Sequence, residues 1–197
     1  MAFATAARRS ELHALSRNLT RDEHWSYVRL RTVDGFLAKN QTVTTGGNTF
    51  RTFVIKKLPT GEDGDGDDDV LLCPVRALRC YDERVVRGVG SERMFVSYMK
   101  GRKTALHPNT VSNYLISCVG IAYELCGKSL PTGVKAHSVR SMSVSWASLR
   151  NVSLQSILEN CYWKSQNTFL NFYLKDLSEI EGDMFRLGRL SVSSTVV

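Results

Sequence analysis

The sequence predicts a mainly helical α+β fold with a small antiparallel β-sheet in its N-terminal third. Segments rich in β-branched and aromatic residues, separated by turn-forming residues, fill much of the region before residue 60. After that region, apolar residues recur at the three- and four-residue spacing of helices. With 197 residues, 43% of them hydrophobic, the chain can bury one ordinary core, so a single domain is the simplest arrangement.

The first segment has a helical pattern. Phe3, Ala7, Leu15 and Leu19 recur with rough helical periodicity, which predicts a helix over residues 3–19. No capping residue precedes this helix, so we expect part of the fold to lie upstream.

Three strands are expected next, over residues 26–32, 35–43 and 49–58. Asp-Gly and Gly-Gly-Asn turn signals separate them, which favours a small antiparallel sheet. The rest of the chain is predicted to be helical. We expect helices over residues 74–88 and 110–127, and three shorter ones near residues 137–149, 153–160 and 167–177.

The charge is uneven along the chain. The formal net charge is +7, from 26 Lys and Arg against 19 Asp and Glu, but six acidic residues lie in the run at 61–69, which we expect to be a solvated loop. Outside this run, 26 basic residues face 13 acidic ones. This excess predicts a polyanionic partner such as nucleic acid. The alternative, from charge alone, is a basic surface that only keeps the protein soluble.

The five cysteines lack the spacing of metal ligands, so no zinc site is expected. Cys118 and Cys126 fall in an apolar helical stretch, which predicts small core residues in a reducing compartment. The N-terminus has no apolar run long enough for a signal peptide, and no stretch approaches the roughly 20 apolar residues of a membrane span. We therefore expect an intracellular protein that contacts no membrane.

Five residues far apart in the sequence form a set suited to phosphodiester chemistry: Arg8, His137, Arg140, Trp163 and Tyr173. Two arginines can clamp a phosphate, a histidine can donate a hydrogen bond or move a proton, an indole N–H can donate, and a tyrosine can attack. Each residue also has an ordinary structural explanation. Arg8 can pair with Glu11 across one helical turn, and the two aromatic residues can be packing residues.

The helix expected over residues 137–149 places His137 and Arg140 about 60° apart on one side. Apolar residues gather on nearly the opposite side: Val139, Met142, Trp146 and Leu149. We therefore expect the apolar side to pack on the core while His137 and Arg140 point away from it. The alternative is a surface histidine and arginine on an amphipathic helix.

This ordered set resembles the tyrosine recombinase (phage integrase) family over nearly the whole chain. The segment TAARRSEL is similar to the family's T-G-x-R-x-S-E-L, with Arg8 at the arginine position and Ala6 where glycine is usual. The pair His137 and Arg140 matches the family's H-x-x-R motif. Trp163 follows 23 residues after Arg140, where family members carry His or Trp.

Tyr173 follows Trp163 by ten residues, at the place of the family's nucleophile. The resemblance implies a mixed α/β catalytic domain over residues 1–180, with a tail over residues 181–197. It implies that Tyr173 attacks a DNA phosphate and forms a 3′-phosphotyrosine bond, without metal, nucleotide cofactor or small-molecule substrate. The implied partner is double-stranded DNA, on which the protein forms a homo-oligomer.

The family also places a lysine on a β-hairpin after the first arginine, where it protonates the leaving 5′ oxygen. Lys39, 31 residues beyond Arg8, is the residue expected in this role, and Lys56 and Lys57 are the alternatives. A lysine at a strand edge is also an ordinary surface residue.

In its local segments, the sequence most resembles the recombinases of eukaryotic mobile elements, the DIRS-type and Crypton-like families. The segments LCPVRALRCY, KAHSVRSMSVSWA and SQNTFLNFYLKD carry this similarity, which implies a nuclear site of action. Such enzymes usually have an N-terminal helical DNA-binding domain, for which Met1 leaves no room. Two other interpretations are therefore kept: an inactive DNA-binding remnant of a mobile element, and a basic nuclear interaction protein.

Overall fold

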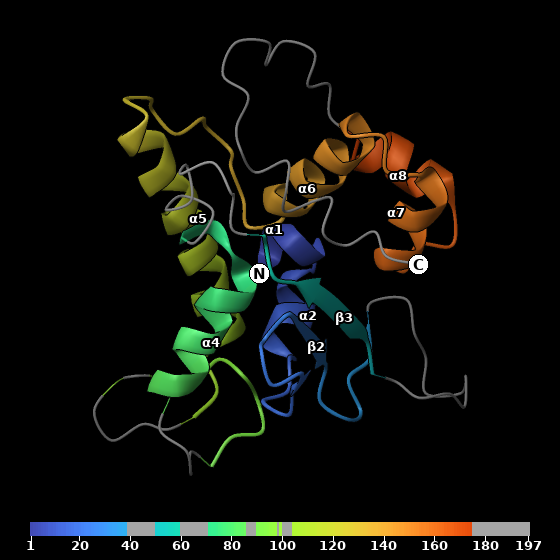
Figure 1. Cartoon of the computed structure of the whole chain (residues 1–197). Helices are drawn as coiled ribbons and strands as arrows, with labels where there is room; N and C mark the ends of the chain where they lie inside the picture. Colours follow the sequence, from blue (N-terminus) through green and yellow to red (C-terminus); the bar gives the residue numbers. More distant parts are fainter. Residues whose placement is uncertain (39–49, 60–70, 86–89, 98, 100–103, 175–197) are drawn as a thin grey trace.

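The computed structural model describes residues 1–38, 50–59, 71–85, 90–97, 99 and 104–174 (Figure 1). The fold is α+β, as predicted. Its helices are α1 (Ala2–Thr5), α2 (Arg9–His13), α4 (Pro74–Arg84), α5 (Pro108–Leu125), α6 (Ser138–Leu149), α7 (Leu154–Asn160) and α8 (Gln166–Phe172). Its strands are β1 (Thr20–Arg21), β2 (Tyr27–Arg31) and β3 (Thr52–Lys56). The acidic run at 61–69, Lys39 and the expected tail, with its boundary at residue 180, lie outside the described residues.

The single helix predicted over residues 3–19 is wrong, because the chain forms two short helices there. Helix α1 ends at Ala6, whose φ of 47° puts it in the left-handed region. A new helix then starts at Arg8, whose backbone N–H donates to Glu11 Oε2 at 2.6 Å. This bond caps α2 in the way that a carboxylate three residues into a helix often does. The break redirects the chain between two buried alanines, which periodicity alone does not reveal.

The sheet is antiparallel, with β2 between β1 and β3. In β2 and β3, Val28 pairs with Ile55 and Leu30 with Phe53, and all four side chains are buried. The strands predicted over 26–32 and 49–58 are thus confirmed. Residues 35–38 are not a strand, and the rest of the strand predicted over 35–43 lies outside the described residues. Strand β1 was too short for its pattern to be seen.

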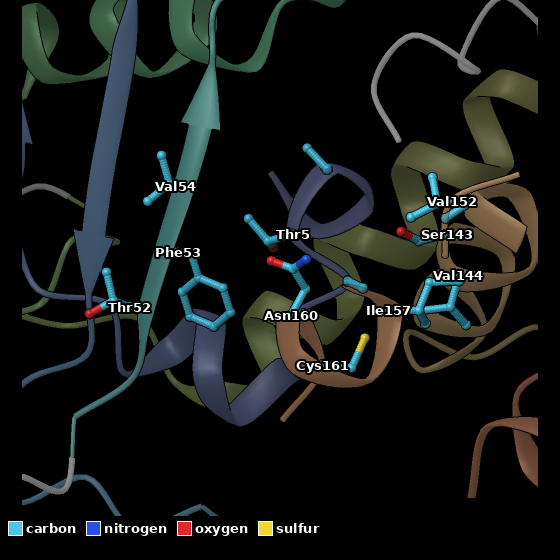
Figure 2. A pocket seen from close by; sticks show the side chains of 13 residues that line it. Thr5, Thr52, Phe53, Val54, Ser143, Val144, Val152, Ile157, Asn160 and Cys161 are labelled. Atoms are coloured by element: carbon cyan, nitrogen blue, oxygen red, sulfur yellow. The ribbon is translucent and has the colours of Figure 1, made fainter. Parts of the chain in front are cut away.

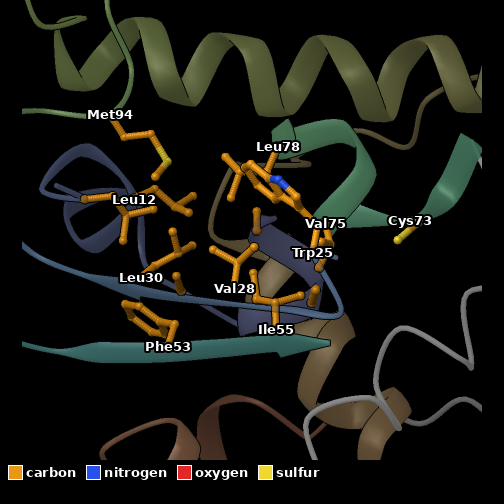
Figure 3. Packing of buried hydrophobic residues seen from close by; sticks show 14 of the residues in the cluster. Leu12, Trp25, Val28, Leu30, Phe53, Ile55, Cys73, Val75, Leu78 and Met94 are labelled. Atoms are coloured by element: carbon orange, nitrogen blue, oxygen red, sulfur yellow. The ribbon is translucent and has the colours of Figure 1, made fainter. Parts of the chain in front are cut away.

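The larger core packs this sheet against α2, α4 and the first turns of α5 (Figure 3). Trp25 and Leu78 meet the apolar side chains of β2 and β3 there. Pro74 opens α4, and its fixed φ suits the first turn of a helix. The helix predicted over 74–88 is confirmed up to Arg84, and residues 86–88 lie outside the described part of the chain.

Helix α5 confirms the prediction over 110–127. It ends just before Gly127, whose φ of 65° suits a residue without a side chain after a helix C-terminus. Val111 is buried, but Cys118, Leu125 and Cys126 are exposed. The expectation that Cys118 and Cys126 are core residues is therefore wrong. Only the first turns of α5 pack on α2 and the sheet, so its later apolar residues face outward.

The three shorter helices are present as α6, α7 and α8, and they enclose a second apolar cluster that includes Val144, Ile157 and Phe169. Helix α8 ends at Phe172, earlier than predicted, and residues 175–177 of the predicted helix lie outside the described part of the chain. The face that α6 buries agrees with the prediction only in part, since Trp146 is buried and Val139 packs on the larger core. Arg140 and three serines are buried, whereas Met142 and Leu149 are exposed. Serine is small enough for α1 to approach closely, and the Ser143 hydroxyl donates to the Phe3 carbonyl. Arg140 therefore points into the protein, not away from it.

No helix in the part of the chain that the structure describes is long and apolar enough to cross a membrane. Within the same residues, no group of three or more His, Cys, Asp or Glu side chains is arranged to hold a metal ion.

Candidate functional site

The site centres on a buried carboxylate that three arginines share. Glu11 is 1% exposed. Its Oε1 lies 2.9 Å from Arg51 Nη1 and 3.2 Å from Arg8 Nη1, and its Oε2 lies 3.5 Å from Arg140 Nη1. Three guanidinium groups around one carboxylate leave a net charge of about +2, because arginine stays protonated in proteins. This spot is therefore strongly favourable for an anion.

Arg140 ties together three separate parts of the chain. Its Nη1 donates to the Ala6 carbonyl and its Nη2 donates to the Cys161 carbonyl at 2.9 Å. The side chain is 2% exposed, and burial lowers the pKa of its guanidinium, an effect that nearby Glu11 opposes. Burial also raises the pKa of the Cys161 thiol to about 11, so this thiol is neutral at physiological pH and adds no charge to the site.

Trp163 owes its position to the way α7 ends. Tyr162 adopts a left-handed conformation with a φ of 54°, and the backbone N–H of Trp163 then donates to the Leu158 carbonyl at 2.8 Å. This is the hydrogen-bond pattern of a Schellman motif, which turns the chain sharply after a helix. The turn brings the Trp163 ring 4.8 Å from Arg140 Cζ, close enough for a cation–π interaction.

Tyr173 follows the last residue of α8, and its backbone carbonyl accepts a hydrogen bond from the buried Ser145 hydroxyl at 3.0 Å. Its ring centre lies 4.4 Å from that of Trp163 and 5.2 Å from that of His137. Arg140 Cζ lies 5.7 Å from the centre of the Tyr173 ring. The Tyr173 hydroxyl makes no hydrogen bond to another described residue.

The structure thus brings together five of the six residues singled out from the sequence. Arg8 lies at the start of α2, His137 just before α6, and the other three line the space between α6 and α8. The sixth, Lys39, lies outside the described residues. The alternatives are Lys56, the last residue of β3, and Lys57, which follows it; at about 3.3 Å per residue they lie roughly 17 and 20 Å along the chain from Arg51. They are poorly placed to reach the arginines.

Several buried N–H donors in this region have no hydrogen-bond partner among the described residues. They are Arg140 Nε, Trp163 Nε1, and Nε and Nη1 of Arg51. Arg51 Nη1 is close to Glu11, but the pair lacks hydrogen-bond geometry. Buried polar groups in folded proteins nearly always have partners. Unpartnered donors around a cluster of net positive charge make this region favourable for a group rich in hydrogen-bond acceptors.

Two members of the cluster were missed from the sequence. The spacing of the sequence predicts Glu11 only as a partner of Arg8, and no motif points to Arg51. The spacing of two residues between Arg51, Phe53 and Ile55 in the expected strand places Arg51 on the same side as these two apolar residues. An arginine on a core face requires a buried acid, and this is the signal that was available.

A hollow lies beside the site, between α1, β3, α6 and α7 (Figure 2). Thr5, Phe53, Ile157 and Asn160 line it, and it holds about 550 Å³ including the solvent at its mouth. It shares Ala6 and Cys161 with the arginine cluster, but none of the arginines, His137 or Tyr173 lines it. The hollow therefore adjoins the cluster without containing its charged side chains.

Comparisons of the chain with protein-family models, with curated proteins and with solved structures find no match.

Proposed function

We propose that this chain is the catalytic domain of a tyrosine recombinase, which breaks and rejoins double-stranded DNA through a 3′-phosphotyrosine intermediate. The observation that supports it most is the position of Tyr173 beside a cluster of three arginines with net positive charge. A phosphodiester is the anion that this arrangement suits, because the tyrosine is a nucleophile and the guanidinium groups match phosphate oxygens.

In the proposed reaction, the Tyr173 oxygen attacks the scissile phosphorus and the bond to the 5′ oxygen breaks. His137, whose ring packs against Tyr173, takes the phenolic proton. Arg8 and Arg140 stabilise the negative charge on the pentacoordinate phosphorus, and the Trp163 N–H donates to one of its oxygens. The leaving 5′ oxygen needs a proton, and Lys39 is the proposed donor. A second 5′ hydroxyl then reverses the attack, so no ATP is needed.

The same proposal includes a nuclear site of action and assembly of several copies on DNA. Strand exchange joins ends from two DNA sites, so copies bound at both sites have to meet. Both points come from the resemblance to mobile-element recombinases.

The second candidate is a DNA-binding protein of the same fold that does not cut. The observation that favours it is that most N–H donors of Arg140 already bond to other groups of the protein. Of the five N–H donors of an arginine, three are used within the protein, by Ala6, Glu11 and Cys161. Only Nε and one N–H on Nη2 are left for a phosphate.

Binding to DNA is expected to be weak, to show little sequence preference and to fall steeply with salt, because outside residues 61–69 basic residues outnumber acidic ones two to one. Fluorescence anisotropy with a labelled duplex measures this between roughly 50 and 200 mM salt, where a protein with several phosphate contacts loses about 10³-fold or more in affinity. An affinity that does not change over this range contradicts both candidates.

The two candidates differ in covalent chemistry. With a nicked duplex from which the cleaved end diffuses away, the recombinase accumulates a protein–DNA adduct that survives SDS. We expect this adduct at micromolar protein concentration. A folded protein that binds the duplex and never forms the adduct is the DNA-binding candidate.

Substitutions of Trp163 test whether its indole N–H serves the reaction. Because the position needs a donor and a packing surface, Trp163→His is expected to keep part of the adduct-forming rate, and Trp163→Ala to lose about 10²-fold, the effect of removing one donor to a developing oxyanion. The rate is measured under single-turnover conditions. An equal rate in Trp163→Ala and the parent makes Trp163 a packing residue only.

A further inference from the structure

Arg51 makes the shortest contact between a guanidinium group and the Glu11 carboxylate. Its Nη1 lies 2.9 Å from Glu11 Oε1, compared with 3.2 Å for Arg8. The residue is 5% exposed, and its backbone N–H donates to the buried Thr32 hydroxyl at 2.9 Å. Its carbonyl accepts a hydrogen bond from the Thr32 N–H, also at 2.9 Å. The backbone of Arg51, just before β3, is therefore fixed by Thr32, the residue that follows β2.

The side chain of Arg51 is also fixed from the other side. Its Cζ lies 4.3 Å from the ring centre of Tyr162. The Tyr162 hydroxyl accepts from the Thr52 N–H at 3.0 Å and donates to the Thr52 carbonyl at 2.8 Å. Trp163 is the next residue in the chain. The contact between Arg51 and Tyr162 thus joins the sheet to the segment that carries Trp163.

The charge balance of the site depends on Arg51. Without it, Arg8 and Arg140 would face the buried carboxylate of Glu11 with a net charge of about +1. The pentacoordinate state formed when a phosphodiester is attacked carries about two negative charges, so stabilising it requires more positive charge than the ground state does. With Arg51 the net charge is about +2, because this third guanidinium offsets Glu11.

We infer that Arg51 is a positioning residue of the site. It neutralises Glu11, so that the charges of Arg8 and Arg140 act on the phosphate instead of being cancelled by the carboxylate. It works through Glu11 and does not touch the DNA. This inference rests on the proposed recombinase function.

The test is a charge-balance cycle. Arg51→Met removes the charge and keeps most of the side-chain volume, and we expect it to slow adduct formation by about tenfold or more, because Glu11 then cancels part of the positive charge that stabilises the transition state. The double variant Glu11→Gln with Arg51→Met restores the net charge of about +2. Glutamine can still accept the Arg8 N–H that caps α2. We therefore expect the double variant to form the adduct faster than Arg51→Met alone.

Arg29→Gln is the matched control, because Arg29 is an exposed arginine of the neighbouring strand β2 and its loss removes the same charge from the protein. It is expected to form the adduct at the parent rate. Thermal unfolding shows which variants fold. If Arg51→Met alone does not fold, Arg51→Lys, which keeps the charge, and the double variant carry the comparison, and both are expected to react.

The outcomes separate the inference from the proposed function. A parent that forms no adduct refutes the recombinase, whereas a reactive parent with an equally reactive Arg51→Met, or a double variant slower than Arg51→Met, refutes the role of Arg51. Binding of inorganic phosphate, measured by calorimetry, gives a reading that needs no cleavage. The parent is expected to bind phosphate, Arg51→Met to lose affinity, and the double variant to regain it. Equal affinity in all three overturns the inference.

Discussion

Tyr173→Phe is expected to abolish the covalent adduct with DNA while the protein stays folded. Phenylalanine keeps the ring contacts with Trp163 and His137, whose centres lie 4.4 and 5.2 Å away. The lost hydroxyl makes no hydrogen bond to another described residue, so the free energy of unfolding should change by no more than about 1 kcal/mol. The measurement is the SDS-stable adduct on a nicked duplex, alongside anisotropy for DNA binding, which should be unchanged.

Tyr162→Phe is the matched control for this experiment. Tyr162 lies one residue before Trp163, and its hydroxyl is occupied by two hydrogen bonds to the Thr52 backbone. Phenylalanine keeps the ring that contacts Arg51, so the loss of the hydroxyl should lower stability slightly and leave adduct formation in place. A peptide map that puts the DNA on Tyr162 or Tyr123 contradicts the assignment of the nucleophile.

Arg140→Ala is expected to destabilise the whole fold, and to abolish cleavage as a consequence. If Arg140 pointed away from the core, as the sequence suggested, its loss would have affected cleavage alone. The structure shows instead that its removal leaves the buried carbonyls of Ala6 and Cys161 without a donor and takes one cation from Glu11. Breaking a buried ion pair in this way typically costs about 3–5 kcal/mol. Urea denaturation followed by circular dichroism measures the loss.

Alanine substitutions of two other arginines serve as comparisons for the stability of Arg140→Ala. Arg150→Ala removes an exposed cation just after α6, and its effect on stability should stay within about 0.5 kcal/mol. Arg8→Ala is expected to lie between them in stability, because its side chain is 17% exposed and it contacts Glu11 across one helical turn. Arg8→Ala should nevertheless slow cleavage strongly. A urea midpoint for Arg140→Ala equal to that of Arg150→Ala shows that Arg140 is not structural.

Local patterns were enough to predict the α+β class, the pairing region of β2 and β3, and helices α4 to α8. They failed where a distant part of the chain decides the outcome. The break at Ala6 exists because α1 packs on α6, and the serine-rich side of α6 is buried because α1 approaches closely there. A rule that places serine outside and methionine inside misplaces the serines and Met142 of α6, since hydroxyl groups bonded to carbonyls can be buried at little cost.

The site was predictable as a set of residues and not as an arrangement. Spacing along the chain selected Arg8, Arg140, Trp163 and Tyr173, and the structure brings them together. Glu11 lies at the centre of the site and Arg51 joins it because of how α2 packs against the sheet and how β2 and β3 pair. No sequence spacing encodes that meeting.

The bond between Arg140 and the Ala6 carbonyl spans 134 residues, which has a consequence for how a newly made chain matures. Contacts between residues so far apart form late, because the entropy of closing a long loop has to be overcome first. At about 5–20 residues per second, Glu11 leaves the ribosome on the order of ten seconds before Trp163 is made. During this time only Arg8 and Glu11 of the arginine cluster are near each other, and both are exposed to solvent. The arginine cluster is therefore completed only when synthesis of the C-terminal helices is nearly finished. A chain that stops short of α6 has Arg8 and Glu11 but lacks Arg140, so it cannot form the cluster.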